Sequence, residues 1–163
     1  MDRRRFISGA VVLAASAILA PGLITSRAAH ARSDNPLGLT DAEWHKRLTP
    51  EQFRVLRMEA TEPAGSSPLN HEKRKGQYAC AGCGQVLFES SAKYDSGTGW
   101  PSFFRAIEGA VETRTDYLAF LPRTEYHCSR CGGHHGHVFN DGPPPTGLRY
   151  CNNGVALTFI PAE

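Results

Sequence analysis

Two cysteine pairs with the same layout constrain the fold of this chain more than any other feature. Cys80-Ala-Gly-Cys83-Gly and Cys128-Ser-Arg-Cys131-Gly each form a tight turn that aims two thiols at one point. Two such turns supply four thiolates, the tetrahedral set that Zn²⁺ prefers, and four protein ligands make a closed, structural site. The 44 residues between the pairs exceed the spacing of an ordinary zinc ribbon. We therefore expect one zinc ion per chain to link the two edges of a sheet region.

Two other interpretations of these cysteine pairs stay open at this point. Disulfides are common in exported proteins, and the N-terminal segment indicates export. A redox-active Cys-x-x-Cys pair is the second, although neither pair lies in a visible strand–helix unit. Export in the folded state, after zinc is loaded in the cytoplasm, would reconcile a metal site with an oxidising compartment.

Residues 1–31 have the features of an export signal peptide. Arg3-Arg4-Arg5 precedes an apolar stretch rich in small residues, and Ala29-His30-Ala31 is a cleavage signal of the small-residue type. Twin arginines indicate the route that exports folded proteins, although Asp2 stands where that signal usually has Ser or Thr. We expect the leader to be cleaved and the protein to be bacterial and periplasmic or otherwise exported. A membrane anchor is the alternative, but Gly, Ser and Pro interrupt the stretch.

The charge balance of the remaining chain points away from a nucleic-acid partner. Without the four arginines and one aspartate of the leader, the 18 basic and 16 acidic residues become 14 and 15. No excess of positive charge remains for a phosphate backbone. We expect a monomer with no stable membrane association after leader cleavage.

The local patterns predict short helices followed by strands in one domain over residues 40–163, after a disordered linker over 32–39. Thr40-Asp-Ala-Glu43 is a capping box before a helix over 41–48, and Thr49-Pro50-Glu51-Gln52 starts a second helix that ends near Ala60. Short apolar or alternating runs bounded by Gly, Pro, Asp and Asn then indicate antiparallel strands. These runs are Val86–Phe88, Tyr117–Phe120, His137–Phe139 and Val155–Ile160.

Cys151 has no partner once the two pairs are set aside, so it is the cysteine to test for chemistry. If Arg149–Asn153 is a strand, the side chains of Arg149, Cys151 and Asn153 share one face. A cation beside the thiol lowers its pKa, and Asn153 can donate to a substrate oxygen. A buried, inert cysteine is the alternative.

Two histidines and a tryptophan complete the set of candidate site residues. His134 and His137 are three residues apart, and Asp141 follows four residues later and could orient one of them. Because four thiolates already fill a zinc shell, these imidazoles are free for acid chemistry, although surface histidines or metal ligands are the ordinary interpretation. Trp100, between Gly99 and Pro101, sits on a rigid turn, with a core tryptophan as the alternative.

These motifs together resemble the B-type methionine sulfoxide reductases over residues 37–160. The motifs that carry the resemblance are Cys80-x-x-Cys83, Gly99-Trp100-Pro101-Ser102-Phe103, Cys131-Gly-x-His134-x-Gly136-His137-Val138-Phe139-x-Asp141-Gly142 and Arg149-Tyr150-Cys151-x-Asn153. The resemblance implies a mainly β fold of two antiparallel sheets with short N-terminal helices and a zinc ion held by Cys80, Cys83, Cys128 and Cys131. It also implies reduction of the R epimer of methionine sulfoxide, mainly in oxidised proteins.

The resemblance assigns a role to each matching site residue. Cys151 is implied to be the nucleophile that becomes a sulfenic acid. Trp100 cradles the methyl group on the substrate sulfur, and Phe139 is also substrate-binding. The residues implied to bind, protonate or support the sulfoxide oxygen are His134, His137, Asn153, Asp141 and Arg149. The choice of proton donor between the two histidines stays open.

The sequence departs from the family pattern at two positions. Many relatives carry a resolving cysteine where Thr98 stands, so we expect no disulfide with Cys151 and recycling by an external thiol, such as a thioredoxin-like protein. His135 stands where relatives usually have Leu, and we expect it to be an extra surface imidazole rather than part of the pocket wall.

Two other functions compete with this interpretation. One is a zinc-ribbon-like β binding module without catalysis, in which Trp100 belongs to an aromatic cage; it leaves Cys151, Arg149 and Asn153 unexplained. The other is a Cys–His acyl-transfer enzyme with His137 as base. Loss of function in Cys151→Ser would exclude the binding module, and formation of a sulfenic acid on Cys151 would count against the acyl-transfer enzyme.

Overall fold

The structure is a computed structural model that describes residues 35–117 and 121–163. The predicted export signal lies outside the described residues, as does the first part of the predicted linker. Residues 35–39 contain a turn and no helix or strand. No helix within the two described ranges is both long and apolar enough to cross a membrane.

Two short helices begin where the capping signals predicted them. α1 (Asp41–Arg47) and α2 (Pro50–Met58) follow Thr40 and Thr49. Each threonine hydroxyl accepts a bond from the amide three residues on, and that residue's side chain accepts from the threonine amide. Both capping boxes are therefore formed, and the predicted pair of N-terminal helices is confirmed.

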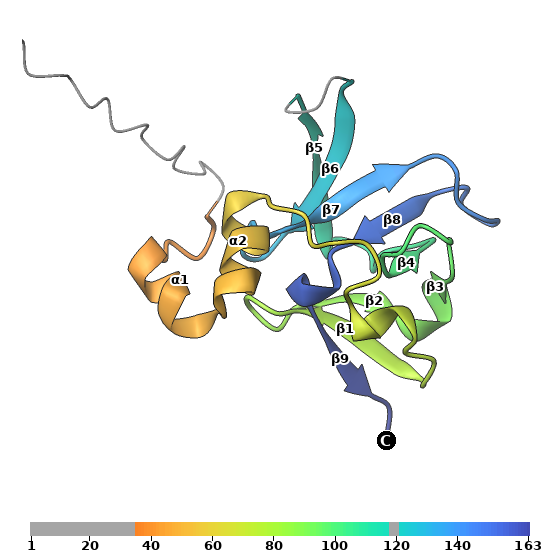
Figure 1. Ribbon diagram of the computed structural model, residues 1–163, viewed down its shortest axis with the longest axis horizontal. Helices are drawn as coiled ribbons and strands as arrows, with labels where there is room; N and C mark the ends of the chain where they lie inside the picture. Colours follow the sequence, from red (N-terminus) through yellow and green to blue (C-terminus); the bar gives the residue numbers. More distant parts are fainter. Residues whose placement is uncertain (1–34, 118–120) are drawn as a thin grey trace, which may run out of the picture. The chain divides into compact units, whose positions relative to one another are not determined.

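The helices pack over the two turns that carry the cysteine pairs. Trp44 of α1 and Leu56 of α2 are each 1% exposed. A Cβ atom on Gly82 would lie 3.5 Å from both side chains, and one on Gly133 would lie 2.9 Å from Leu56. The buried faces of α1 and α2 therefore pack against the two cysteine turns. Figure 1 shows α2 close to β7.

The strands form two antiparallel sheets (Figure 1), as predicted. The smaller sheet has the order β2 (Val86–Glu89), β1 (Gly76–Cys80), β9 (Leu157–Pro161). The larger sheet has the order β3 (Lys93–Tyr94), β4 (Ser102–Phe103), β8 (Arg149–Asn152), β7 (His134–Phe139), β6 (Arg123–Cys128), β5 (Val111–Asp116). Single turns of 3-10 helix also occur, namely η1 (Pro68–Asn70), η2 (Ser90–Ala92) and η3 (Gly154–Ala156).

An aromatic core fills the space between the two sheets. Phe88 from the smaller sheet stacks on Phe103 from the larger one with ring centroids 4.2 Å apart, and both are fully buried. Tyr78 meets Phe103 edge-on at 4.9 Å, and Tyr126 meets Tyr150 at 5.2 Å. Because edge-to-face and offset pairs add to simple burial, this cluster fixes how the sheets face each other.

Two of the predicted strands differ from the structure. The run predicted over 155–160 starts as η3 and becomes a strand only at Leu157, because the backbone turns after β8. Tyr117 follows the end of β5, and the other three residues of the predicted strand 117–120 lie outside the described residues. β8 ends at Asn152, so Asn153 is not on the strand that carries Cys151.

Candidate active site

The four paired cysteines converge as predicted. Their sulfur atoms all lie within 4.8 Å of one another. Cys80 Sγ is 3.6 Å from Cys131 Sγ, and Cys83 Sγ is 3.5 Å from Cys128 Sγ. A disulfide needs about 2.05 Å, whereas a tetrahedral site with metal–sulfur bonds of about 2.3 Å places the sulfurs about 3.8 Å apart. The donor set and its spacing therefore fit a metal ion held by four thiolates.

The cysteine cluster joins the two sheets at their ends. Cys80 is the last residue of β1 in the smaller sheet, and Cys128 is the last residue of β6 in the larger sheet. Cys80, Cys128 and Cys131 are buried. A metal ion here would hold the sheets together at the edge covered by α1 and α2.

Cys151 lies apart from this cluster, on β8 in the centre of the larger sheet, and lines a small cavity. The cavity has a volume of ≈130 Å³. The residues that line it are Thr61, Trp100, Arg123, Gly136, His137, Phe139, Cys151, Asn152 and Asn153. The predicted nucleophile is therefore accessible from a cavity with an aromatic wall and an imidazole.

The position of Cys151 depends on the close pairing of β7 with β8. His137 lies opposite Cys151 in the antiparallel register. The preceding residue, Gly136, has a φ of 156°, and a Cβ atom there would lie 1.9 Å from the Cys151 carbonyl oxygen. Only glycine lets the two strands approach closely enough to bring the imidazole and the thiol to one cavity.

The thiol of Cys151 has two polar neighbours, yet its pKa is raised. Burial raises the pKa, and the Thr98 hydroxyl, with its Oγ1 4.0 Å from Cys151 Sγ, and the Arg149 charge lower it only in part. The expectation that Arg149 lowers the thiol pKa is confirmed, but burial raises that pKa by more than Arg149 lowers it. The thiol is consequently protonated at neutral pH in the free protein.

Arg149 is neutralised by Asp141, which explains its weak effect on the thiol. The guanidinium donates two hydrogen bonds of 2.8 Å to the Asp141 carboxylate and lies 4.3 Å from the Phe139 ring centroid. Asp141 therefore holds Arg149 against Phe139, and the prediction that Asp141 orients a histidine is wrong.

His137 instead contacts Asp116, a residue that the sequence did not single out. His137 Nε2 lies 2.8 Å from Asp116 Oδ2, and Arg123 Nη2 donates to the same oxygen at 2.7 Å. Because a carboxylate only accepts, Nε2–H donates and Nδ1 is the nitrogen left for chemistry. Burial lowers the pKa of His137, and the bond to Asp116 opposes that effect in part.

His134 lies behind His137 and does not line the cavity. It is 2% exposed, and its Nδ1 is 2.7 Å from the buried carboxylate of Glu125. Glu125 also pairs with Arg114, which reaches Glu59 at 2.5 Å. The two imidazoles contact each other edge-on with centroids 5.5 Å apart. His134 is thus placed to support His137 from behind.

The expectation that His135 is a surface imidazole is wrong. Its side chain is fully buried, and its Nδ1 lies 3.3 Å from Asn152 Oδ1. The ring stacks on Tyr126 with an interplanar angle of 15°. Burial lowers the pKa of His135 to about 3, so it is a neutral core residue, at the point where the register of β6 with β7 shifts.

Trp100 and Asn153 form two walls of the cavity, and both are bonded to Glu62. Trp100 Nε1 donates to the Glu62 carbonyl at 3.1 Å, and Asn153 Oδ1 accepts from the Glu62 amide at 2.9 Å. Asn153 Nδ2 also donates to the His135 carbonyl at 3.0 Å. The structure therefore brings Trp100, His137, Phe139, Cys151 and Asn153 to one cavity, with Arg149 and Asp141 beside it and His134 behind it.

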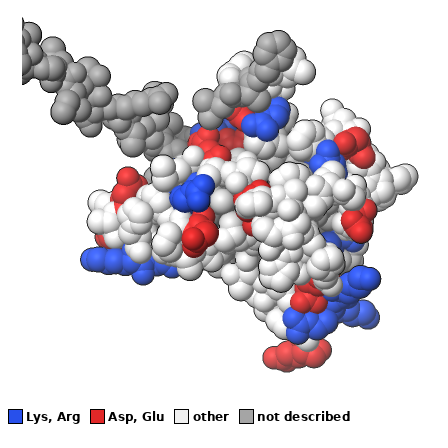
Figure 2. Space-filling view, viewed as in Figure 1, with Lys and Arg blue, Asp and Glu red and all other residues white. Residues whose placement is uncertain are grey.

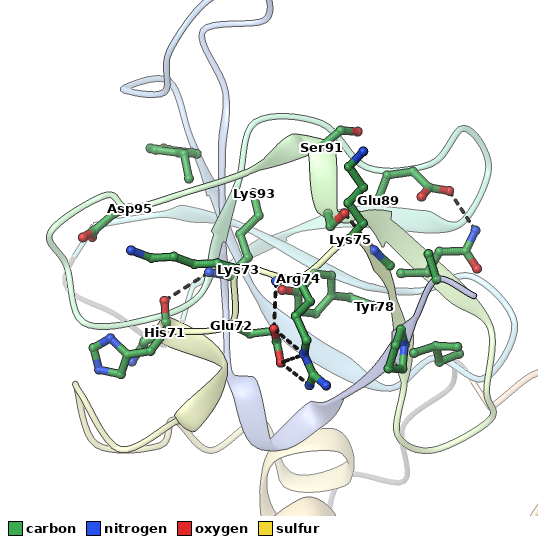
Figure 3. Close-up of a pocket in the computed structure, with 18 residues that line it drawn as sticks. His71, Glu72, Lys73, Arg74, Lys75, Tyr78, Glu89, Ser91, Lys93 and Asp95 are labelled. Atoms are coloured by element: carbon green, nitrogen blue, oxygen red, sulfur yellow. Dashed lines mark hydrogen bonds and ion pairs between the residues drawn. The ribbon is translucent and has the colours of Figure 1, made fainter.

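A larger hollow elsewhere on the molecule offers no comparable chemistry. It has a volume of ≈950 Å³, lies between the segment before β1 and strands β2 and β3, and contains no cysteine among its described lining residues (Figure 3). Three of its charged groups have hydrogen-bond partners: Glu72 binds Arg74, and Lys93 donates to the Asn70 carbonyl at 3.1 Å. Figure 2 shows positive and negative side chains interspersed in small groups over the viewed face.

Comparison with known proteins assigns the chain to a family. The SelR domain family matches residues 48–161. A protein of Leptospira interrogans named peptide methionine sulfoxide reductase MsrB is 54% identical over 121 residues, which are 74% of this chain and 92% of the relative. A protein of the same name from Thiobacillus denitrificans is 54% identical over 125 residues, or 76% and 95% of the two chains. A protein of the same name from Methanosarcina barkeri is also 54% identical over 125 residues, which are 76% of this chain and 88% of the relative. This chain, with its cysteine cluster and its Cys151 cavity, belongs to the family of B-type methionine sulfoxide reductases.

Proposed function

We propose that this protein reduces the R epimer of methionine sulfoxide, mainly in oxidised proteins, by attack of Cys151 on the substrate sulfur. The observation that carries the proposal is that the Cys151 thiol and the His137 imidazole line one small cavity with Trp100 and Phe139. The relatives named peptide methionine sulfoxide reductase support the substrate class.

The chemical step needs a nucleophile for sulfur and a proton for the oxygen. In the free protein Cys151 carries a raised pKa and His137 a lowered one, so both are neutral at pH 7. The thiol proton passes through His137 to the sulfoxide oxygen while Cys151 Sγ bonds to the substrate sulfur. The hydroxyl then moves from the substrate sulfur to Cys151 Sγ. The sulfur–oxygen bond of the substrate and the new Sγ–sulfur bond break, so methionine leaves and Cys151 becomes a sulfenic acid.

His137 is the proton donor because, of the two candidate histidines, only it lines the cavity. Asp116 accepts from Nε2, so it stabilises the imidazolium that forms transiently when Nδ1 takes the thiol proton. Arg123 donates to the same carboxylate and holds it in place. His134, held by Glu125, packs behind the ring of His137 and limits its rotation.

Selectivity for one epimer follows from the contrast between the walls of the cavity. Trp100 and Phe139 offer an apolar surface that fits the methyl group on sulfur, while His137 and Asn153 offer polar hydrogens to the oxygen. Exchanging the methyl group and the oxygen would leave both unsatisfied, which costs about 1–3 kcal/mol for the buried polar group alone.

Cys151 is recycled by an external thiol, such as a thioredoxin-like reductant. The chain has five cysteines, and the other four form the cluster described above. Thr98 is the residue beside the Cys151 sulfur, and a threonine cannot form a disulfide.

The cluster holds one structural Zn²⁺ and the leader directs export. Four thiolates in a closed tetrahedral arrangement favour zinc and leave no open position for substrate. The twin arginines and the cleavage signal of residues 1–31 support a periplasmic or otherwise exported monomer whose substrates are exported proteins.

The test is a single turnover without reductant. Metal-loaded protein mixed with excess N-acetyl-methionine sulfoxide should yield one equivalent of the reduced product, and dimedone should then label Cys151 alone. Cys151→Ser should form no product while keeping its metal. Product without a dimedone-reactive Cys151, or undiminished product formation by Cys151→Ser, would overturn the mechanism. Absence of product from the metal-loaded parent protein would bring the non-catalytic binding module forward.

A further inference from the structure

Glu62 connects the two sides of the substrate cavity through four hydrogen bonds. Its amide donates to Asn153 Oδ1 at 2.9 Å, and its carbonyl accepts from Trp100 Nε1 at 3.1 Å. Its carboxylate accepts from the amides of Gly154 at 2.6 Å and Val155 at 2.9 Å. The main chain of Glu62 thus holds two cavity walls, and its side chain ties that main chain to the start of η3.

The segment that carries Glu62 has no regular structure to hold it. It lies between α2 and η1, where no helix or strand is formed. It packs tightly on the residue after Asn153, because a Cβ atom on Gly154 would lie 1.9 Å from Ser67 Oγ. Charge-assisted bonds from two amides to one carboxylate are stronger than neutral ones, so they define where this segment sits.

The amide of Glu62 also decides which end of the Asn153 side chain faces the substrate. Because Oδ1 accepts from Glu62 and one Nδ2 hydrogen donates to the His135 carbonyl, the second Nδ2 hydrogen is left for the cavity. A flipped amide would oppose an N–H to the Glu62 N–H. In the same way, the single polar hydrogen of Trp100 fixes the orientation of its indole.

We propose that Glu62 is a positioning residue that sets the distance between the methyl-binding wall at Trp100 and the oxygen-binding donor at Asn153, and thereby sets epimer selectivity. The inference rests on the proposed function. Neighbouring Thr61 lines the cavity itself, so movement of this segment changes the cavity directly.

The experiment compares Glu62→Ala and Glu62→Gln with the parent protein on the separated R and S epimers of N-acetyl-methionine sulfoxide. A displacement of about 1 Å costs about 100-fold in rate. We therefore expect Glu62→Ala to lower kcat/KM for the R epimer by about 10- to 100-fold and to reduce the ratio of R to S by at least about tenfold. Glu62→Gln keeps one acceptor oxygen, so its kcat/KM and its ratio of R to S should lie between those of the parent protein and those of Glu62→Ala.

Glu72→Ala is the matched control, because it also removes a carboxylate that accepts several bonds, at a residue that does not line the cavity. It should leave the ratio of R to S unchanged. If Glu62→Ala lowers the melting temperature yet keeps the parent selectivity and kcat/KM, Glu62 is only structural and the inference is wrong. If Glu62→Ala does not fold, Glu62→Gln is measured in its place, and parent selectivity and kcat/KM in that variant would likewise show that the inference is wrong. A parent protein that reduces neither epimer would instead overturn the proposed function.

Discussion

Replacing Gly136 by alanine should damage stability and activity together, because it separates the two strands that carry the reacting groups. The added Cβ atom would lie 1.9 Å from the Cys151 carbonyl oxygen, whereas real Cβ contacts are essentially never shorter than 3.0 Å. The backbones of β7 and β8 must therefore move apart by about 1 Å, a displacement that costs about 100-fold in rate when it falls between reacting groups.

The cost in stability follows from the same geometry. Overpacking costs about 1–3 kcal/mol, and weakening two hydrogen bonds of the β7–β8 ladder adds about 1 kcal/mol each. We expect Gly136→Ala to lower the free energy of unfolding by about 3–5 kcal/mol, and hence the melting temperature by more than about 10 °C.

The measurement is thermal unfolding alongside kcat/KM for the R epimer. Gly147→Ala is the control, since Gly147 has a φ of 70° but no heavy atom within 4 Å of an added Cβ. It should cost only the strain of a left-handed alanine, about 1–2 kcal/mol. A Gly136→Ala protein as stable as Gly147→Ala, with kcat/KM within about twofold of the parent, would refute the close approach of β7 and β8.

The remaining predictions concern the buried charges and the metal. Glu125→Gln should destabilise the protein by about 3–5 kcal/mol, because it removes a buried anion that partners His134; chemical denaturation that shows less than about 1 kcal/mol would contradict this. Asp141→Asn removes an anion that raises the pKa of Cys151, so iodoacetamide alkylation of Cys151 should reach half its maximal rate at a lower pH than in the parent, and a shift upward or no shift would count against the Arg149–Asp141 pair. A strong chelator should remove one zinc per chain and lower the melting temperature by more than about 10 °C, whereas Cys151→Ser should keep the zinc; metal analysis and calorimetry check both.

The features that could be predicted from the sequence are those encoded over a few neighbouring residues. The capping box at Thr40 and the turn at each cysteine pair are local, so they specify local structure directly. The position of Arg149 and Cys151 on the same face of β8 also follows from the period of a strand. The two-sheet arrangement came from the resemblance to a family rather than from these local signals.

The residues that sequence reasoning missed reach the site through strand pairing. Asp116 ends β5 and Glu125 lies within β6, and neither stands in a motif with the histidine that it contacts. Only the register of β5 with β6 and of β6 with β7 brings these carboxylates to the imidazoles. Asp141 was assigned to a histidine because of its nearness in sequence, but the chain reverses after β7 and delivers it to Arg149.

The error at His135 has a different physical cause. A histidine with polar neighbours in sequence is expected at the surface. Strict alternation along β7 would place His135 on the same face as His137, but the register of β6 with β7 shifts at His135, and its side chain is buried in the core. Burial keeps the ring neutral, and Asn152 Oδ1 accepts the one N–H of the neutral ring, so the core tolerates it.

The measurement that tests the central claim most directly is turnover of racemic N-acetyl-methionine sulfoxide by residues 32–163 with excess dithiothreitol, followed by chiral separation of what remains. The account predicts that half of the substrate is consumed and that the remainder is the S epimer. Consumption of both epimers at similar rates would contradict the stereoselective cavity, and consumption of neither by zinc-loaded protein would contradict the assignment of Cys151 and His137 as the reacting pair.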